Sequence, residues 1–265
     1  MLNILISNDD GVHAPGINSL YNALKDIANV VVIAPLQERS TTGHTLTLDH
    51  PLRVQKISDN IYGCSGYPAD CTLLGLAHLL KNKPDLVISG INRGANLGQD
   101  TYYSGTVAAA REASFRGVPA ISVSTDIDYA IVHKDNIHFN SAAKYIRHLV
   151  LGDIHQLIPS MTVLNINVPD LAWNEIKGHD VGELGHRIYS EEVKERRDFK
   201  DREYFWIGGV YKGHDNNALS DCNIVDESKI SITLLNLLQK PTETVIKTDL
   251  FDRVFEKGLG SFENS

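Results

Sequence analysis

Two adjacent carboxylates, Asp9 and Asp10, follow the first apolar run of the chain in the turn-like sequence NDDG. Adjacent carboxylates that face one site repel each other unless a cation lies between them. Ser40, in the loop after the second apolar run, and Asn92, just beyond the third, would add neutral oxygen donors. A set of hard oxygen ligands suits Mg²⁺ or Mn²⁺ better than zinc. Asp-Asp-Gly alone is typical of a turn, but the shared position at strand ends favours a metal site.

A second candidate site lies where a hydroxyl-rich turn enters an alanine-rich stretch, in the sequence YYSGTVAAA. The first turn of a helix leaves N–H groups unpaired and carries the positive end of the helix dipole, and together these bind phosphate. Ser104 or Thr106 would add a hydroxyl donor, although an ordinary helix cap is the commoner use of such residues. Three preceding glycines would let backbone approach a ligand, or only shape a loop: Gly90, Gly94 and Gly98.

Other residues that could do chemistry give weaker signals. The 11 His residues show no metal-ligand spacing. His13, His44 and His186 lie in loops, where each is either a general acid or a solvated, hydrogen-bonded side chain. Cys64 and Cys71 are expected to be small core residues. The sequence lacks GxxxxGK[ST], GxGxxG, GxSxG and HExxH, which excludes the usual NTPase, dehydrogenase, α/β-hydrolase and zinc-protease classes.

The elements that must position these residues alternate between short β-branched runs and helical stretches. Strands are expected at 2–7, 30–34, 85–89, 118–124 and 162–168, and helices at about 15–27, 70–81, 106–115 and 140–151. This order is typical of a Rossmann-like, mostly parallel sheet with helices on both faces. Ligands bind beyond the carboxyl ends of such strands, near the point where the strand order reverses. The candidate residues fall at that edge.

The second half of the chain breaks this rhythm. Residues 180–210 are charged and end in the aromatic sequence YFWI, which predicts a protruding β-hairpin over about 180–214. An alternating segment at 45–54 is expected to be a hairpin arm, 230–235 a strand and 242–255 a terminal helix. Because the sequence shows no internal repeat and no interdomain linker, we expect a single α/β domain over 1–265.

The charge balance bears on the partners of the protein. The 265 residues include 25 Lys and Arg against 33 Asp and Glu, a formal net charge of −8, whereas proteins that bind nucleic acids or anionic membranes concentrate basic residues. The apolar runs are far shorter than the roughly 20 residues of a membrane span, and the first residues do not resemble a signal peptide. Three Cys without a CxxC pair favour a reducing compartment. We therefore expect a soluble, cytoplasmic protein that binds neither DNA nor a membrane.

Taken together, these residues resemble the SurE family (stationary-phase survival protein E), metal-dependent 5'/3'-nucleotidases. The resemblance is carried by ILISNDDGVHAPGI near the start, ERS at 38–40, DLVISGINRGANLGQDTYYSGTVAAAREA at 85–113 and GVPAISVS at 117–124. Weaker echoes occur in LNINVP, YFWIG and ISIT. The resemblance spans most of the chain, and the combination of SGIN with YSGT and the alanines after it is highly specific.

The resemblance implies roles position by position. The family's metal ligands, which would hold one divalent ion (Mg²⁺ or Mn²⁺) per subunit, fall on Asp9, Asp10, Ser40 and Asn92. The implied catalytic residues are Asp9, Asp10, Asn92 and Ser104. The implied substrate and phosphate contacts are Asn96, Ser104, Gly105 and Thr106, with Asn8 in support.

The resemblance also implies an activity and an assembly. Family members act on nucleoside monophosphates, and some also shorten polyphosphate. A C-terminal segment, here about 220–265, is exchanged between the subunits of a homodimer, which often pairs again into a homotetramer. Departures from the family pattern concern that segment: this chain has SD at 220–221 where the family usually has TD, and SITLL where it usually has SITPL. The metal site is untouched.

The resulting hypothesis is hydrolysis of nucleoside monophosphates by a metal-activated water, with the helix N-terminus at Thr106 stabilising the phosphoryl oxygens. An aspartyl-phosphate on Asp9 is an alternative, disfavoured because a carboxylate bound to metal is a poorer nucleophile. Two further alternatives are a non-catalytic nucleotide-binding regulatory module and a structural assembly protein. The charge of −8 favours mononucleotides over long polyphosphate or RNA, because one small anion needs no basic patch.

Overall fold

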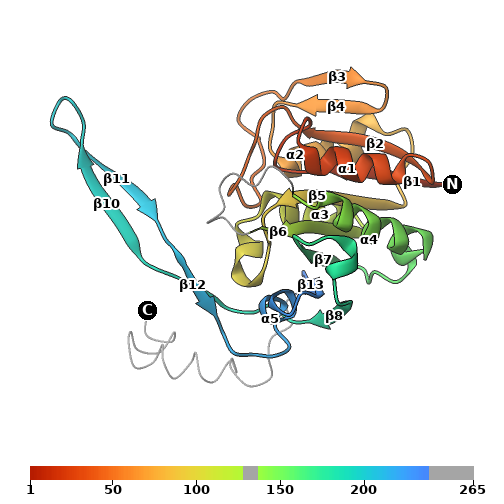
Figure 1. Ribbon diagram of the computed structural model, residues 1–265. Coiled ribbons are helices and arrows are strands. Elements are labelled where there is room, and N and C mark those ends of the chain that lie inside the picture. Colours follow the sequence, from red (N-terminus) through yellow and green to blue (C-terminus); the bar gives the residue numbers. More distant parts are fainter. Residues whose placement is uncertain (128–136, 239–265) are drawn as a thin grey trace, which may run out of the picture. The chain divides into compact units, whose positions relative to one another are not determined.

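The apolar run at the N-terminus forms β1 (Leu2–Ser7), in the middle of a nine-stranded sheet. The computed structural model describes residues 1–127 and 137–238. The strand order is β3-β4-β2-β1-β5-β6-β7-β13-β8 (Figure 1). Parallel pairing links the central strands β2 (Ala28–Pro35), β1, β5 (Leu86–Arg93), β6 (Ala120–Asp126) and β7 (Thr162–Pro169). The predicted mostly parallel α/β sheet is confirmed.

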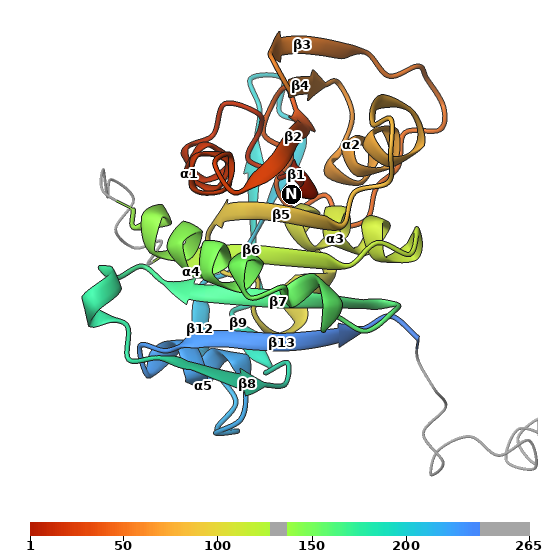
Figure 2. The same ribbon diagram turned by 90° about the vertical axis from the view of Figure 1, so that its right-hand side faces the viewer.

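Helices cover both faces of this sheet, as Figure 2 shows. On one face lie α1 (Pro15–Leu24) and α4 (Phe139–Leu151), and on the other α2 (Pro68–Leu74) and α3 (Gly105–Phe115). Pro15 stands in the first turn of α1, where its missing N–H costs least. A π-helical turn, Gly75–Leu79, extends α2. All four helices were expected, within a few residues at their ends.

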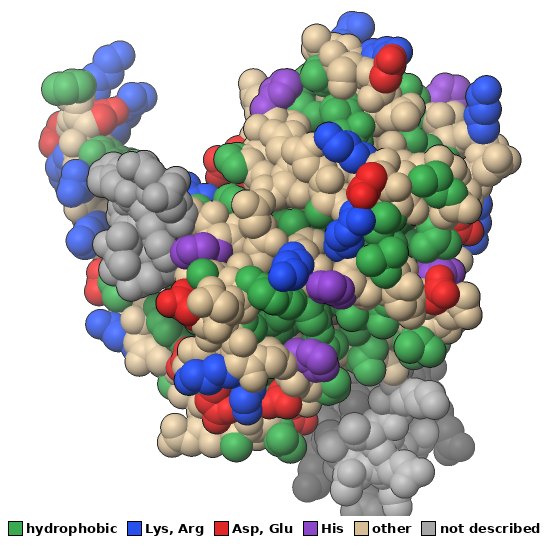
Figure 3. Space-filling view, turned by 45° about the vertical axis from the view of Figure 1, so that its right-hand side comes forward, with side chains coloured by type: hydrophobic (Ala, Val, Ile, Leu, Met, Phe, Trp, Pro, Cys, Tyr) green, Lys and Arg blue, Asp and Glu red, His purple; other side chains and the backbone are tan. Residues whose placement is uncertain are grey.

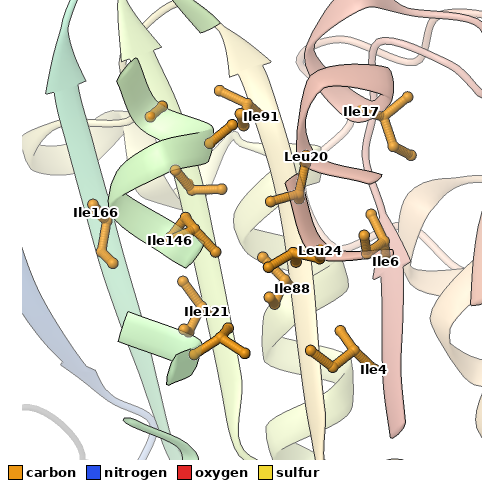
Figure 4. Close-up of a cluster of buried hydrophobic side chains, with 14 of the residues drawn as sticks. Ile4, Ile6, Ile17, Leu20, Leu24, Ile88, Ile91, Ile121, Ile146 and Ile166 are labelled. Atoms are coloured by element: carbon orange, nitrogen blue, oxygen red, sulfur yellow. The ribbon is translucent and has the colours of Figure 1, made fainter. Parts of the chain in front are cut away.

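The core between α1, α4 and the sheet is built from branched aliphatic side chains (Figure 4). Leu20 and Leu24 of α1 and Ile146 of α4 are fully buried against Ile88 of β5 and Ile121 of β6. Burying each such side chain stabilises the fold by about 1.5–3 kcal/mol. This packing fixes the strands whose ends carry the candidate residues.

The edge of the sheet beyond β2 differs from the expectation. The hairpin there consists of β3 (Val54–Ser58) and β4 (Ile61–Cys64), which pair antiparallel. The segment expected to be a hairpin arm, 45–54, contains no strand before Val54. Its alternation has another cause: the N–H and hydroxyl of Thr47 donate to the carboxylate of Asp70, at 2.9 and 2.7 Å, so a side chain and not a neighbouring strand holds this segment.

The charged region forms two small antiparallel sheets, β9 (Arg187–Tyr189) with β12 (Tyr211–His214), and β10 (Glu192–Arg197) with β11 (Glu203–Gly208). Every residue of β10 and β11 is exposed, and Figure 1 shows this pair extending away from the main sheet. The hairpin is therefore present. The first residues of the expected range instead form β8 (His179–Gly182), which pairs with β13 (Ile230–Asn236) in the main sheet.

The remaining elements are short: α5 (Asp221–Asp226) and the 3₁₀ turns Gly98–Tyr102, Ile154–Gln156 and Trp173–Glu175. Met1–Leu235 forms one compact unit; of the second unit, Asn236–Ser265, the structure describes only 236–238. The helix expected at 242–255 and most of the expected exchange segment lie outside the described residues. In the described part of the chain, no helix is long and apolar enough to cross a membrane.

Candidate functional site

The strand order reverses beside β1, and the candidate residues gather at that point. From β1 the chain moves to β2 on one side and later to β5 on the other, so the carboxyl ends of β1 and β5 border the crevice where doubly wound sheets bind ligands. Asp9 and Asp10 follow β1. Asn92 lies inside β5, beyond a register irregularity between Ser89 and Asn92, and not past the end of the strand as expected.

Asp9 is held in place by the start of α3. Only 4% of Asp9 is exposed, and Thr106 donates its hydroxyl to Oδ1 of Asp9. Burial raises the pKa of Asp9, and the opposing effect of Thr106, through its hydroxyl and its backbone N–H, is smaller. A β-carbon on Gly105 would lie 2.9 Å from Cβ of Asp9. Only glycine therefore lets the helix approach this carboxylate so closely.

The pKa of Asp10, like that of Asp9, is raised. Burial, together with the negative charge of Asp9, raises the pKa of Asp10 to about 7. The backbone N–H of Arg93 donates to Oδ2 of Asp10 at 3.0 Å and opposes that shift. Two adjacent, largely buried carboxyl groups that both resist ionisation are what a bound cation would stabilise.

Ser40 and Asn92 bring neutral oxygens to the same place. The backbone N–H of Arg39 donates to the carbonyl of Asp9 at 2.8 Å, which sets the Ser40 loop beside the end of β1. Ser40 donates its hydroxyl to Glu38 at 2.7 Å. Asn92 donates its amide nitrogen to the carbonyl of Gly94 at 2.7 Å, which leaves the amide oxygen as its available ligand atom.

A polar cavity of about 250 Å³ collects most of the predicted residues. It is lined by Asp9, Ser40, Thr41, Asn92, Arg93, Ala95, Asn96, Asp100, Tyr103 and Ser104. Asp10 lines an adjoining cavity of about 430 Å³ that shares Arg93 with the first. Asp9 thus lines one cavity, Asp10 lines the other, and Arg93 lines both.

Three predicted contacts do not lie on the cavity wall. Asn8 is fully buried and bonds Gly11 twice, donating from Nδ2 to its carbonyl at 2.9 Å and accepting its N–H at 3.2 Å. It shapes the turn that carries the carboxylates and does not reach a substrate. Thr106 is also fully buried, with its hydroxyl committed to Asp9, and Gly105 gives the clearance described above. Of the expected phosphate turn, Ser104 alone lines the cavity.

Sequence reasoning missed Arg93, Asp100 and Tyr103 as cavity residues. Arg93 stands directly after Asn92, and a basic side chain beside a metal-ligand candidate was the available signal. The carboxylate of Asp100 accepts hydrogen bonds from Nη1 of Arg187, at 2.8 Å, and from the hydroxyl of Tyr189. These bonds connect β9, at the base of the hairpin, to the cavity wall. That link joins residues 87 positions apart, and no local pattern could have shown it. His13, His44 and His186, weighed as general acids, do not line this cavity.

The donor set fits a hard divalent cation. Two carboxylates, a hydroxyl and an amide oxygen are oxygen ligands of the kind that Mg²⁺ and Mn²⁺ prefer. Within residues 1–127 and 137–238 no group of three or more His, Cys, Asp or Glu is placed to hold a metal ion. A metal here would therefore depend on Asp9, Asp10 and neutral oxygens. Burial raises the pKa of both carboxyl groups, and a cation would offset this cost of ionising them.

The fold and this cavity together define a doubly wound α/β protein with an oxygen-rich candidate ligand site at its switch point. The family model for Survival protein SurE matches residues 4–191. The chain therefore belongs to the SurE family, as its motifs predicted.

Named relatives and a solved structure agree with this assignment. The 5'-nucleotidase SurE of Geotalea daltonii is 43% identical over 236 residues, which cover 89% of this chain and 93% of that protein. The 5'-nucleotidase SurE of Geobacter sulfurreducens is 44% identical, over 89% of this chain and 88% of its own. The crystal structure of the SurE protein from Aquifex aeolicus superposes with a TM-score of 0.78 at 37% identity, over 96% of this chain and 98% of that one.

Proposed function

We propose that this protein is a nucleotidase, a phosphomonoesterase that releases phosphate from nucleoside 5'-monophosphates and also from 3'-monophosphates, with one divalent metal ion per subunit. The observation that carries the proposal is the convergence of Asp9, Ser40, Asn92, Asn96 and Ser104 on one cavity at the switch point. The names of the relatives support the substrate class.

Asp9, Asp10, Ser40 and Asn92 are the residues that would hold the metal, Mg²⁺ or Mn²⁺. When bound, such an ion lowers the pKa of a water molecule and neutralises charge on a phosphoryl group. Asp9 is oriented for this task by Thr106, and Asp10 by the backbone N–H of Arg93. The hydrogen bonds from Thr106 and from the backbone of Arg93 matter because a carboxylate that turns freely binds a metal less well.

The cavity residues that are not metal ligands can bind and orient the phosphate. Ser104 accepts the N–H of Val107 at 3.0 Å as the cap of α3, so its own hydroxyl hydrogen is available to a phosphoryl oxygen. Asn96 lines the cavity and carries amide hydrogens. Arg93 adds a positive charge at the junction of the two cavities. Together they would hold the anion beside two carboxylates that would otherwise repel it.

The finer parts of the proposal follow the family resemblance. They are a side activity on short polyphosphate, assembly as a homodimer or homotetramer through the segment at about 220–265, and a cytoplasmic location. On the face seen in Figure 3, Lys and Arg side chains are scattered among acidic and neutral ones. Such a surface favours a small substrate over a long polyanion.

Phosphate release from a panel of nucleoside 5'- and 3'-monophosphates, measured with Mn²⁺, with Mg²⁺ and with EDTA, tests the proposal. We expect release that requires metal and is nearly abolished in Asp9→Asn. The matched control is Asp26→Asn, because Asp26 pairs with Arg147 on the surface and should keep full turnover. Nucleotide binding without phosphate release under any metal condition would identify a binding module instead, and undiminished activity in EDTA would exclude the metal.

A further inference from the structure

Asn96 is held by an unusually complete set of buried hydrogen bonds. Its backbone N–H donates to Oδ1 of Asn167 at 2.8 Å. Its carbonyl accepts Nδ2 of Asn165 at 2.9 Å and Nδ2 of Asn167 at 3.0 Å. Its side-chain amide nitrogen donates to the hydroxyl of Ser124 at 2.6 Å. None of these four residues is more than 4% exposed, so both the backbone and the side chain of Asn96 are fixed.

The bonding pattern leaves defined groups of Asn96 for a ligand. An amide side chain has two N–H donors and one oxygen that accepts. Ser124 of β6 takes one hydrogen of the amide nitrogen. The second N–H and the amide oxygen remain, and Asn96 lines the cavity of Asp9 and Ser104.

The two asparagines of β7 are poorly explained by packing alone. Residues two apart in a strand point to the same face, so Asn165 and Asn167 stand side by side, whereas Ile166 between them packs into the core of Figure 4. A buried amide costs free energy unless its donors and acceptors are bonded. Here that bonding is directed at Asn96, and the oxygen of Asn165 is satisfied by the hydroxyl of Ser122 at 2.8 Å.

The geometry points to Asn165, Asn167 and Ser124 as positioning residues of the active site, and we propose that they hold Asn96 in the one orientation in which its amide contacts the substrate phosphate. This inference rests on the proposed nucleotidase function. It assigns a role to the LNINVP sequence of β7, which the metal site does not use. The three residues act through Asn96 and do not touch the substrate.

A double-mutant cycle on turnover and on phosphate binding tests the inference. Enzyme variants Ser124→Ala, Asn167→Ser and Asn96→Ala are made singly, and the first two are also combined with Asn96→Ala. Turnover of AMP with Mn²⁺ and the dissociation constant of inorganic phosphate are measured for each. Because a misplacement of about 1 Å can cost on the order of 100-fold in rate, we expect each positioning variant to lose about 10- to 100-fold in kcat. In the Asn96→Ala background there is no amide left to misplace, so the same substitutions should change kcat and phosphate affinity less than about 2-fold.

Ser114→Ala is the matched control. The hydroxyl of Ser114 donates to the carbonyl of Thr162 in β7 at 3.2 Å, so this substitution also removes one buried hydrogen bond but does not affect Asn96. It should leave kcat unchanged in both backgrounds. Ser124→Ala removes one small hydroxyl, so it keeps the test valid even where Asn167→Ser does not fold. Losses of equal size in the wild-type and Asn96→Ala backgrounds, or no loss in Ser124→Ala, would overturn the inference. An inactive wild-type enzyme would instead refute the nucleotidase function itself.

Discussion

Replacing Gly105 by Ala places one methyl group between the start of α3 and the carboxylate of Asp9. The new β-carbon would lie 2.9 Å from Cβ and 3.0 Å from Oδ2 of Asp9, and 3.1 Å from Cγ of Pro68. Carbon atoms in contact prefer at least about 3.5 Å, so Asp9 and the helix must separate by roughly 0.6 Å. The clash costs on the order of 1–3 kcal/mol, and the higher helix propensity of Ala offsets up to about 1 kcal/mol of that. The variant should therefore fold.

The same displacement should be much more damaging to activity than to stability. A shift of about 1 Å at a catalytic group can cost on the order of 100-fold in rate, so we expect kcat to fall by about 10-fold or more and Mn²⁺ to bind more weakly. Phosphate release, calorimetric titration with Mn²⁺ and thermal unfolding measure the three quantities. Gly152→Ala is the control, because its β-carbon meets no atom closer than 3.5 Å. Wild-type kcat and Mn²⁺ affinity in Gly105→Ala would refute the assignment of Asp9 to the active site.

Two further predictions concern stability. Ile146→Ala removes a fully buried side chain of α4 and should lower the free energy of unfolding by about 2–5 kcal/mol; denaturant unfolding showing less than about 1 kcal/mol would contradict the packing of α4 on the sheet. Burial raises the pKa of Glu112, but hydrogen bonds from His44 and Arg116 outweigh it and leave the pKa below its ordinary value of 4.5. The ionised form thus stabilises the fold above that pH, and the contribution is lost as the pH falls below it. Glu112→Gln should accordingly lose less stability than the wild type between about pH 5 and pH 3, and parallel pH profiles would show the pair to be unimportant.

The central sheet was predictable because its strands contain short runs rich in β-branched and other apolar residues, and the stretches between them carry helical apolar spacing. Leu2–Ser7 forms a strand with the expected bounds, and the start of α3 follows a Ser cap at Ser104. The metal-ligand candidates were predictable for a related reason: polar residues near the carboxyl ends of buried strands lie at one edge of a parallel sheet, although Asn92 falls inside β5 and not after it.

The misses have physical causes that act at long range. Segment 45–54 alternates like a strand, but Asp70 bonds Thr47 and the segment pairs with no strand before Val54. Thr106 was expected to face a phosphate, yet its hydroxyl is used by Asp9, 97 positions earlier. Asp100 lines the cavity, and its carboxylate accepts a hydrogen bond from the distant Arg187. Each outcome was decided by a tertiary partner that the local sequence does not specify.

The place of β13 in the sheet has a consequence for the order in which the protein is made. Within residues 1–127 and 137–238, β13 is the last strand in the sequence, yet it lies between β7 and β8. Strands β1 to β7, with the carboxylates and Asn96, have all left the ribosome before β13 is synthesised, whereas β8 must wait for β13 before it joins the sheet. Asp221, just ahead of β13, accepts the N–H groups of Gly98 and Gly185 at 2.9 and 2.8 Å. The nascent chain can therefore pair the strands that lead to the carboxylates and to Asn96 before Asp221 is made. The backbone of Gly98, two residues before Asp100 on the cavity wall, gains its bond only after Asp221 has been synthesised.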